Sequence, residues 1–141
     1  MTDITRLQAT ETLAAYAGTI YAHIGGDATI RQLVDRFYGL MDTLPEAWEL
    51  RKQHPEDLSG SADKLYDYFS GWLGGPPRFI EKHGQPFLRR RHLPFQVGKL
   101  ERDQWMMCME MAAKDVLTND EVCQRFLEAL GELATHMQNR A

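Results

Sequence analysis

The apolar residues of this chain recur at the spacing of an α-helix, and this pattern limits the possible folds more than any other feature. Between residues 30 and 41 they occupy positions i, i+3, i+4, i+7, i+8 and i+11 of one helix face. Similar series predict helices over about 60–73 and 99–117, and a last one that begins near residue 118. No segment alternates apolar and polar residues as a half-buried strand does. The chain is therefore expected to be all-α.

Turn and cap signals place the ends of these helices. Two glycines precede the first long helix, and Asp27 is expected to cap its start. Pro45 suits the first turn of a short helix that ends near Lys52. The glycines and prolines of residues 74–77 end the helix before them. Residues 118–121 read as a capping box, which starts the last helix.

A segment of about twenty residues, 78–98, separates two of the predicted long helices, and it reads mainly as a loop. At most one short helix is expected there, from Pro86 to near Arg91. Long loops in compact domains are usually functional or disordered. This one carries three consecutive arginines that lead directly into His92.

Composition excludes several classes of protein. A length of 141 residues, with 43% hydrophobic and 26% charged residues, indicates one globular domain. The net charge of −4 argues against general binding to nucleic acid. No apolar run approaches the ~20 residues of a membrane span, and no secretory signal is visible. Two cysteines, Cys108 and Cys123, are too few for a disulfide framework, so a cytoplasmic location is expected.

Among the residues that carry chemistry, His92 has the most distinctive surroundings. The chain has no zinc-type pairing among its five histidines, no phosphate loop and no nucleophile elbow. One histidine in a basic loop that faces aromatic helices matches what haem needs: an imidazole ligand, an apolar slot and cations for its propionates. The alternatives are a solvated loop histidine and an arginine run that forms a solvated face or binds an anionic partner.

Four stretches, in order and at the right spacing, resemble the group II truncated haemoglobins. The resemblance covers about residues 21–135. It rests on the sequences GG and RFY (25–26, 36–38), GWLGGPP (71–77), RRRHLPF (89–95) and ERDQW (101–105).

This resemblance implies a globin-like, two-over-two helical sandwich over residues 21–141, with residues 1–20 as an N-terminal helical extension. It implies haem b as the cofactor and His92 as the iron ligand. Tyr38, Trp105 and His54 would be the distal residues that stabilise a bound ligand. On their own, Tyr38 and Trp105 would be read as core residues, and His54 as a helix-end residue.

The resemblance also implies a wall for the haem slot. Lys64 and Arg91 would face the propionates, although Lys64 could instead pair with Asp63 or Asp67. The residues expected around the haem are Phe37, Ser61, Lys64, Leu65, Phe79, Arg91, Phe95 and Met109.

The expected function is binding of O2, and of CO, NO or peroxide, with tight O2 binding and slow release. An alternative is a redox enzyme on the same scaffold, a peroxidase or NO dioxygenase, which would need an external reductase because the sequence carries no flavin motif. A second alternative is a haem-free helical interaction module. A monomer or homodimer is expected, without nucleic-acid or membrane partners.

Overall fold

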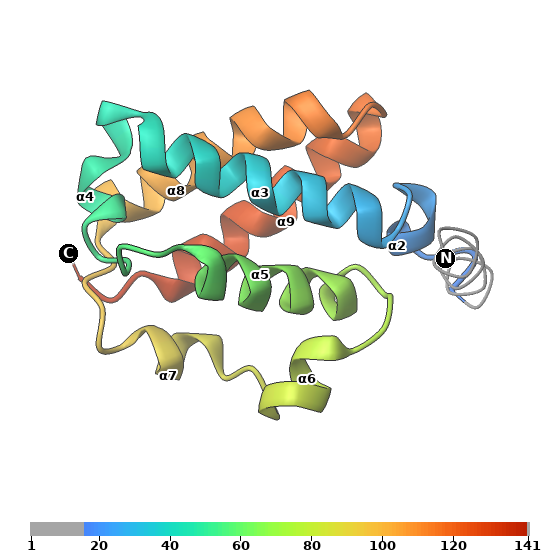
Figure 1. Ribbon diagram of the computed structural model, residues 1–141, viewed down its shortest axis with the longest axis horizontal. Helices are drawn as coiled ribbons and strands as arrows, with labels where there is room; N and C mark the ends of the chain where they lie inside the picture. Colours follow the sequence, from blue (N-terminus) through green and yellow to red (C-terminus); the bar gives the residue numbers. More distant parts are fainter. Residues whose placement is uncertain (1–15, 141) are drawn as a thin grey trace.

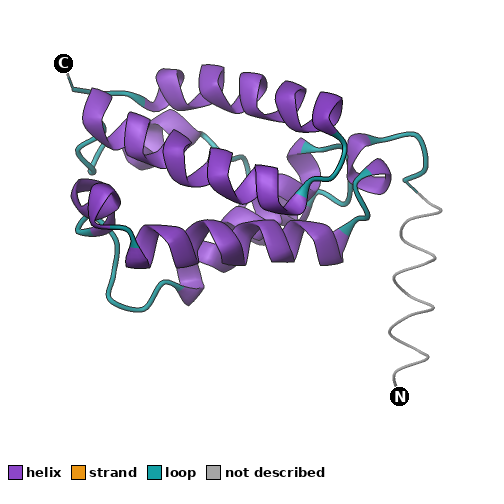
Figure 2. Ribbon diagram, turned by 90° about the horizontal axis from the view of Figure 1, so that it is seen from above, coloured by secondary structure: helices purple, strands orange, loops and turns teal. Residues whose placement is uncertain are grey.

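The computed structural model describes residues 16–140, and every regular element within that range is helical (Figure 1, Figure 2). Short helices alternate with long ones. The elements are α2 (Ile20–His23), α3 (Asp27–Thr43), a 3-10 turn (Pro45–Ala47), α4 (Trp48–Arg51), α5 (Ser59–Trp72), α6 (Arg78–His83), α7 (Leu88–His92), α8 (Lys99–Val116) and α9 (Asp120–Met137). The expected all-α architecture is confirmed over the described residues. No helix in that range is long and apolar enough to cross a membrane.

The four long helices form two packed pairs around one core. Helix α3 packs against both α5 and α8, and α8 packs against α9 (Figure 1). This is the expected two-over-two arrangement. Apolar residues spaced along each helix meet between the pairs and exclude water, which is the main favourable term in folding. The core includes Ile30, Leu33, Val34, Phe37, Met41, Phe69, Cys108, Met109, Ala112, Ala113, Phe126 and Leu130. Cys108 and Cys123 are free, buried thiols.

The segment 78–98 holds two short helices, where the sequence predicted at most one. Helix α6 was missed because contacts distant in sequence hold it. The Arg78 guanidinium bonds the Asp27 carboxylate at 2.6 and 3.0 Å. Lys82 Nζ bonds both oxygens of the buried Asp67 at 3.1 Å. The helix expected from Pro86 begins at Leu88 and ends at His92.

The predicted caps are wrong in detail at two helices. Gly26 is the N-cap of α3, and Asp27 does not cap it. The Asp27 carboxylate instead accepts hydrogen bonds from the Tyr21 hydroxyl at 2.6 Å and from Arg78. At α9 the capping side chain is that of Asn119, whose Oδ1 accepts the N–H of Val122 at 3.0 Å. In α8, Leu100 is 53% exposed and does not lie on the buried face that the periodicity predicted.

Gly75 provides a test of how tightly the turn after α5 is packed. A Cβ at this position would lie 2.5 Å from two ring carbons of Tyr21 and 2.9 Å from the Ser70 carbonyl oxygen. We expect Gly75→Ala to lower the free energy of unfolding by about 1–3 kcal/mol, the usual cost of overpacking. Urea denaturation of the purified protein measures this change in the free energy of unfolding.

The matched control is Gly39→Ala, in the middle of α3, where an added Cβ meets nothing within 4 Å. This change should raise stability by about 0.5–1 kcal/mol, because alanine favours a helix interior. Equal effects of the two substitutions would contradict the close approach of Gly75 to Tyr21.

Candidate functional site

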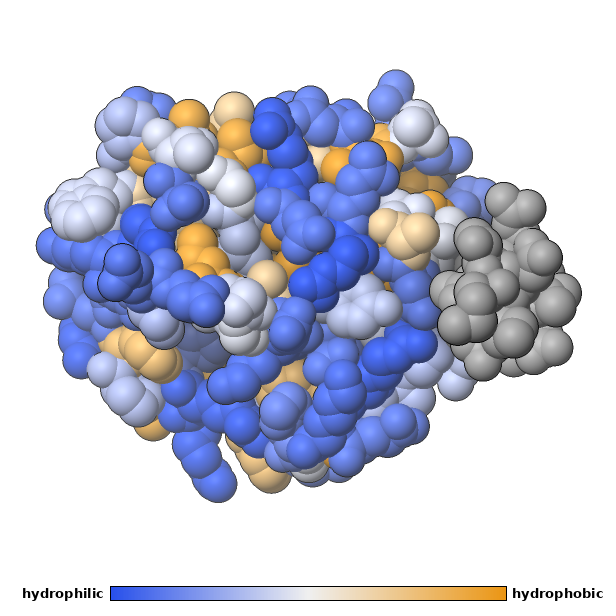
Figure 3. All heavy atoms as spheres, in the orientation of Figure 1, coloured by the Kyte–Doolittle hydropathy of each residue, from blue (hydrophilic) through white to orange (hydrophobic). Residues whose placement is uncertain are grey.

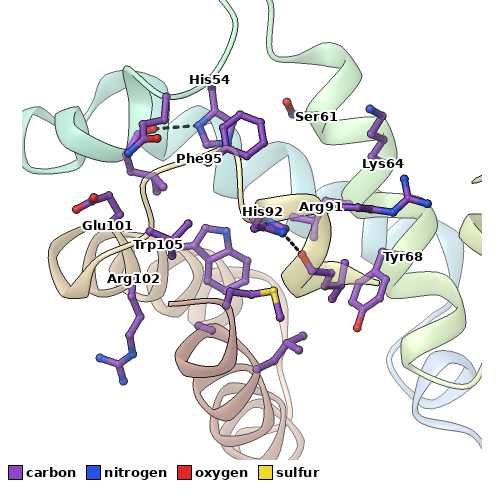
Figure 4. A pocket seen from close by; sticks show the side chains of 18 of the residues that line it. His54, Ser61, Lys64, Tyr68, Arg91, His92, Phe95, Glu101, Arg102 and Trp105 are labelled. Carbon is purple, nitrogen blue, oxygen red and sulfur yellow. Dashed lines mark hydrogen bonds between the residues drawn. The ribbon is translucent and has the colours of Figure 1, made fainter. Parts of the chain in front are cut away.

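One cavity of about 540 Å³ lies between α5 and α7, and α4, α8 and α9 complete its walls (Figure 4). Its size is within the range of small-molecule and cofactor sites. Most of its lining is apolar, while the face of the molecule drawn in Figure 3 is largely hydrophilic. The lining includes Tyr38, Leu50, His54, Ser61, Lys64, Leu65, Tyr68, Phe79, Leu88, Arg91, His92, Phe95, Trp105, Leu130 and Leu133.

A backbone hydrogen bond to one nitrogen of the His92 ring leaves the other nitrogen open toward a ligand. Its Nδ1 lies 2.6 Å from the carbonyl oxygen of Leu88, one helical turn earlier (Figure 4). A carbonyl only accepts hydrogen bonds, so Nδ1 carries the proton. In the neutral ring, Nε2 then keeps its lone pair for a metal ion. This arrangement, in which a backbone carbonyl fixes the tautomer, is typical of histidines that bind metals.

Helix α7 has no buried side chain of its own, so other contacts must position His92. Arg91 provides one set of contacts, all of them to other residues of the segment 78–98. Its Nε donates to the Pro86 carbonyl at 2.6 Å, and its Nη2 donates to the carbonyls of His83 and Gln85 at 3.0 and 3.1 Å. The guanidinium thereby ties α7 to the turn that joins it to α6.

The C-terminal end of the described chain provides a second set of contacts to α7. The Asn139 side-chain amide donates to the carbonyls of His92 and Phe95, both at 3.1 Å. Arg89 Nη1 donates to the carbonyls of His136 and Gln138, both at 3.2 Å. Nothing in the sequence marked Asn139 as part of the site, because its partners are backbone groups more than forty residues away.

Tyr38 and Trp105 place two hydrogen-bond donors on the cavity wall. Each ring packs on Phe37, at centroid distances of 4.9 and 5.0 Å. Neither the Tyr38 hydroxyl nor the Trp105 indole N–H has a hydrogen-bond partner between residues 16 and 140. No fully buried side-chain polar atom in that range is unpaired, so neither donor is fully buried, and both residues line the cavity. Burial raises the pKa of Tyr38, which keeps its proton on.

His54 lies beside Tyr38, with a ring-to-ring distance of 6.1 Å. Its Nδ1 donates to the Leu50 carbonyl at 3.0 Å, so its Nε2 is the nitrogen left without a backbone partner. Burial lowers the pKa of His54 by more than the hydrogen bond to the Leu50 carbonyl raises it, and the charge of Arg51 adds to the lowering. The ring is therefore neutral at pH 7 and adds a polar but uncharged group to the cavity.

The other predicted residues divide into two sets. Phe37 and Met109 do not line the cavity: both are fully buried, and Phe37 packs behind Tyr38 and Trp105. The residues that do line it are Ser61, Lys64, Leu65, Phe79, Arg91 and Phe95.

Lys64 has no carboxylate partner within residues 16–140. Its expected alternatives are taken, because Asp63 pairs with Arg31 and Asp67 pairs with Lys82. Lys64 therefore remains available to an anionic group at the cavity wall.

Two glutamines that the sequence did not single out hold the cavity's outer edge. The Gln53 amide donates to the Gln96 carbonyl at 2.6 Å and accepts the Gln96 N–H at 2.8 Å. Gln104 Oε1 accepts the N–H of Leu50 at 2.9 Å. These bonds join α4 to α8 and to the loop after α7. Tyr68, on α5, is a further lining residue that the sequence analysis missed.

These features together fit the haem that the sequence resemblance implies. The cavity combines an imidazole Nε2 with a free lone pair, apolar walls for a flat macrocycle, and two cations, Lys64 and Arg91, for propionates. The residues present therefore match the chemistry of this cofactor.

Comparisons with known proteins show the family and agree with the fold. A family model for bacterial-like globins matches residues 19–139. The chain is 36% identical over 115 residues to the group 2 truncated haemoglobin YjbI of Bacillus subtilis, covering 82% of this chain and 85% of that protein. It is 51% identical to the group II 2-on-2 haemoglobin of Agrobacterium tumefaciens, with a TM-score of 0.86 and coverage of 87% and 95%.

Two more solved structures are similar. The cold-adapted truncated haemoglobin of Pseudoalteromonas haloplanktis is 38% identical, with a TM-score of 0.86 over 87% of this chain and 99% of that one. A truncated haemoglobin of Bacillus subtilis, described as oxygen-avid, is 36% identical, with a TM-score of 0.80 over 86% and 100%.

Asn139→Ala tests whether the C-terminal residues hold α7. The change removes the two hydrogen bonds that the side-chain amide donates to the carbonyls of His92 and Phe95, worth about 0.5–1.5 kcal/mol each, and also the bond that Oδ1 accepts from the Val97 N–H. Amide exchange at Arg91 and Leu93 should therefore speed up by about 5- to 150-fold, while α3 is unaffected. Hydrogen–deuterium exchange of the segment around α7 measures it. Gln124→Ala is the control, since the Gln124 amide bonds only Glu128 on the same helix surface. Unchanged protection of α7 in the Asn139 variant would contradict the proposal that Asn139 holds α7 in place.

Proposed function

This chain belongs to the bacterial-like globin family, as a group II truncated haemoglobin, and we propose on that premise that its pocket holds O2 tightly and releases it slowly. As a globin of this group it carries haem b and binds small gas ligands such as O2. When bound, the haem supplies a ferrous iron that takes such a ligand reversibly. The proposal covers which ligands besides O2 are bound, how tightly O2 is bound, and what single residues do.

His92 is proposed as the protein's ligand to the iron. Its Nδ1–H is held by the Leu88 carbonyl, so Nε2 is the nitrogen directed to the metal. The hydrogen bond also fixes the ring orientation before the cofactor enters. Lys64 and Arg91 are proposed to face the propionates, and Ser61, Leu65, Phe79 and Phe95 to contact the macrocycle.

The observation that carries the proposed tight binding is the presence of two unpaired donors, Tyr38 O–H and Trp105 N–H, in the same cavity as His92. A diatomic ligand that draws charge from iron becomes a good hydrogen-bond acceptor. Donors aimed at such a partly charged group contribute roughly 1.5–3 kcal/mol each. Each donor therefore changes affinity by roughly ten- to a hundredfold. His54 is proposed as the third distal residue.

The same donors are expected to raise the affinity for O2 more than the affinity for CO. NO and CO are proposed as further ligands, but they take up less negative charge and gain less from Tyr38 and Trp105. The Bacillus subtilis relative described as oxygen-avid supports tight O2 binding in this chain as well.

We also propose a globin domain that begins near residue 21, and a cytoplasmic location. The free thiols of Cys108 and Cys123 support the proposed location.

A redox enzyme on the same scaffold is the second candidate, as a peroxidase or NO dioxygenase. Two donors that slow ligand release give a bound ligand time to react, which favours redox chemistry over O2 delivery. Such an enzyme needs an external reductase. Steady consumption of NO with a reductant present would support the NO dioxygenase, and a reaction that stops after one NO per haem would favour ligand storage or binding instead.

His92→Gly should remove the iron ligand while leaving the cavity intact. We expect the purified variant to lose most of its haem, seen as a loss of the Soret band relative to protein absorbance. Added imidazole should restore haem binding by occupying the space of the missing ring. His83→Gly is the control, because His83 is an exposed histidine close to His92 in the sequence. This variant should keep one haem per chain. Full haem retention with an unchanged spectrum in the His92 variant would remove His92 as the ligand.

Tyr38→Phe and Trp105→Leu test the two distal donors. Each removes one hydrogen bond to the bound ligand, so O2 dissociation should accelerate by roughly tenfold or more. Stopped-flow displacement of O2 by CO measures the rate. Tyr68→Phe is the matched control, because the Tyr68 hydroxyl points away from His54 and Trp105 (Figure 4). An unchanged dissociation rate in both distal variants would overturn the proposed network.

A further inference from the structure

Positive charge is concentrated on the segment that carries His92, although the chain as a whole has a net charge of −4. Between Glu81 and Glu101 there is no aspartate or glutamate. The cations of this stretch are Lys82, Arg89, Arg90, Arg91 and Lys99. The region around α7 is therefore an isolated basic area on an acidic protein.

The cations near α7 are also the ones without carboxylate partners. Elsewhere within residues 16–140, arginines and lysines pair with aspartate or glutamate, as Arg36 does with Asp115 and Arg125 with Glu121. Among the residues that the structure describes, the cations that make no such pair are Lys64, Arg89, Arg90, Arg91, Lys99 and Arg140. An unpaired cation keeps its full field for an external anion.

Lys64 and Arg91 line the haem cavity, so the propionates account for them. The other four do not line it, and backbone contacts bring them together. Arg89 bonds the carbonyls of His136 and Gln138, and the Arg140 N–H bonds the Val97 carbonyl at 3.1 Å. Lys99 follows two residues later, at the start of α8. This basic face, defined by Arg89, Arg90, Lys99 and Arg140, has no function in holding haem.

Large apolar side chains are exposed on the same segment. Phe87, Leu93 and Leu100, none of which lines the cavity, are 56, 50 and 53% exposed. Phe87 adopts a left-handed backbone conformation (φ 41°, ψ 50°), unusual for a bulky residue, and the Arg90 guanidinium lies 4.9 Å from its ring centroid. Exposed aromatics beside arginines are the residues enriched in protein–protein interfaces.

We propose that the basic face and these apolar side chains form a docking surface for an acidic electron-donor protein, an inference that rests on the proposed haem function. The charge of the face complements an acidic partner, and its apolar residues fit a protein better than a polyanion. The docked partner would lie against α7, whose His92 is the proposed iron ligand, so its redox centre would be close to the haem.

An electron donor is the partner that the site requires. O2 binds ferrous iron, and the chain carries no flavin or nucleotide motif with which to reduce ferric iron itself. The donor's reduced iron–sulfur or flavin centre loses one electron and the ferric iron gains it. No bond is made or broken in this step. The surface therefore supplies recognition, and the partner supplies the electron.

The test uses the haem-loaded full chain and two acidic probes, a plant-type [2Fe–2S] ferredoxin and a flavodoxin. Binding is measured by calorimetry at low and at moderate ionic strength. We expect binding of either probe at low salt that weakens at least tenfold as salt screens the charges. A basic c-type cytochrome serves as the probe that should not bind.

The test variant is Arg90→Glu/Lys99→Glu, which reverses two charges outside the haem cavity. It should weaken binding of the acidic probe at least tenfold and slow reduction of the ferric protein by the reduced probe to a similar extent. The control is Lys114→Glu/Arg125→Glu, the same change of charge in the last turn of α8 and in the first half of α9, away from Lys99 and from the C-terminal residues. It should leave both quantities within about twofold of the wild type.

Haem content separates this inference from the proposed function. One haem per chain and an unchanged Soret band in both variants would leave the haem function intact, whatever the binding result. Equal affinity of the two variants for the acidic probe would overturn the docking surface, as would failure of the wild type to bind either probe. Binding instead to vesicles of phosphatidylglycerol or to duplex DNA, lost in the Arg90 variant, would also overturn it and assign the surface to a polyanion.

Discussion

The position of the proposed iron ligand depends on hydrogen bonds from side chains to backbone carbonyls. Helix α7 is only five residues long and buries no side chain, so the hydrophobic effect does little to hold it. Arg91 bonds three carbonyls on one side of it, and Asn139 and Arg89 bond it to the C-terminal residues on the other. Such bonds hold a helix in place without filling the space beside it, and a cofactor cavity needs that space to stay open.

A second polar cluster fixes where this segment begins. Arg78, at the start of α6, bonds the Asp27 carboxylate at the start of α3 and the Ser70 hydroxyl near the end of α5. Asp27 also accepts the Tyr21 hydroxyl, and burial and that bond raise the pKa of Tyr21 to about 12. The cluster joins three helices and α2 at the end of the sandwich away from α4. From there the chain runs through α6 and α7 along the open side of the cavity.

The cations of the protein divide by position, and this division connects the fold to the function. Within residues 16–140, those on α3, α4, α6, α9 and, apart from Lys99 at its start, α8 have carboxylate partners, and most of these pairs are exposed and contribute little to stability. Those on and beside α7 have backbone partners or none. Two of them, Lys64 and Arg91, lie on the cavity wall, and the others face outward, where they add to an exposed apolar surface.

The sequence by itself determined the long helices, because a 3.6-residue period of apolar side chains is a local property that burial in a two-layer sandwich preserves. It also singled out His92, Tyr38 and Trp105, since the spacing of four motifs matched a known family. It did not predict α6, the cap of α3 or the hydrogen bonds by which Asn139 holds α7, because these depend on bonds between residues far apart in the chain. Nor did it separate Phe37 from Tyr38: neighbours on a helix point about 100° apart, and only the packing of α3 against α8 decided which ring faces the core and which faces the cavity.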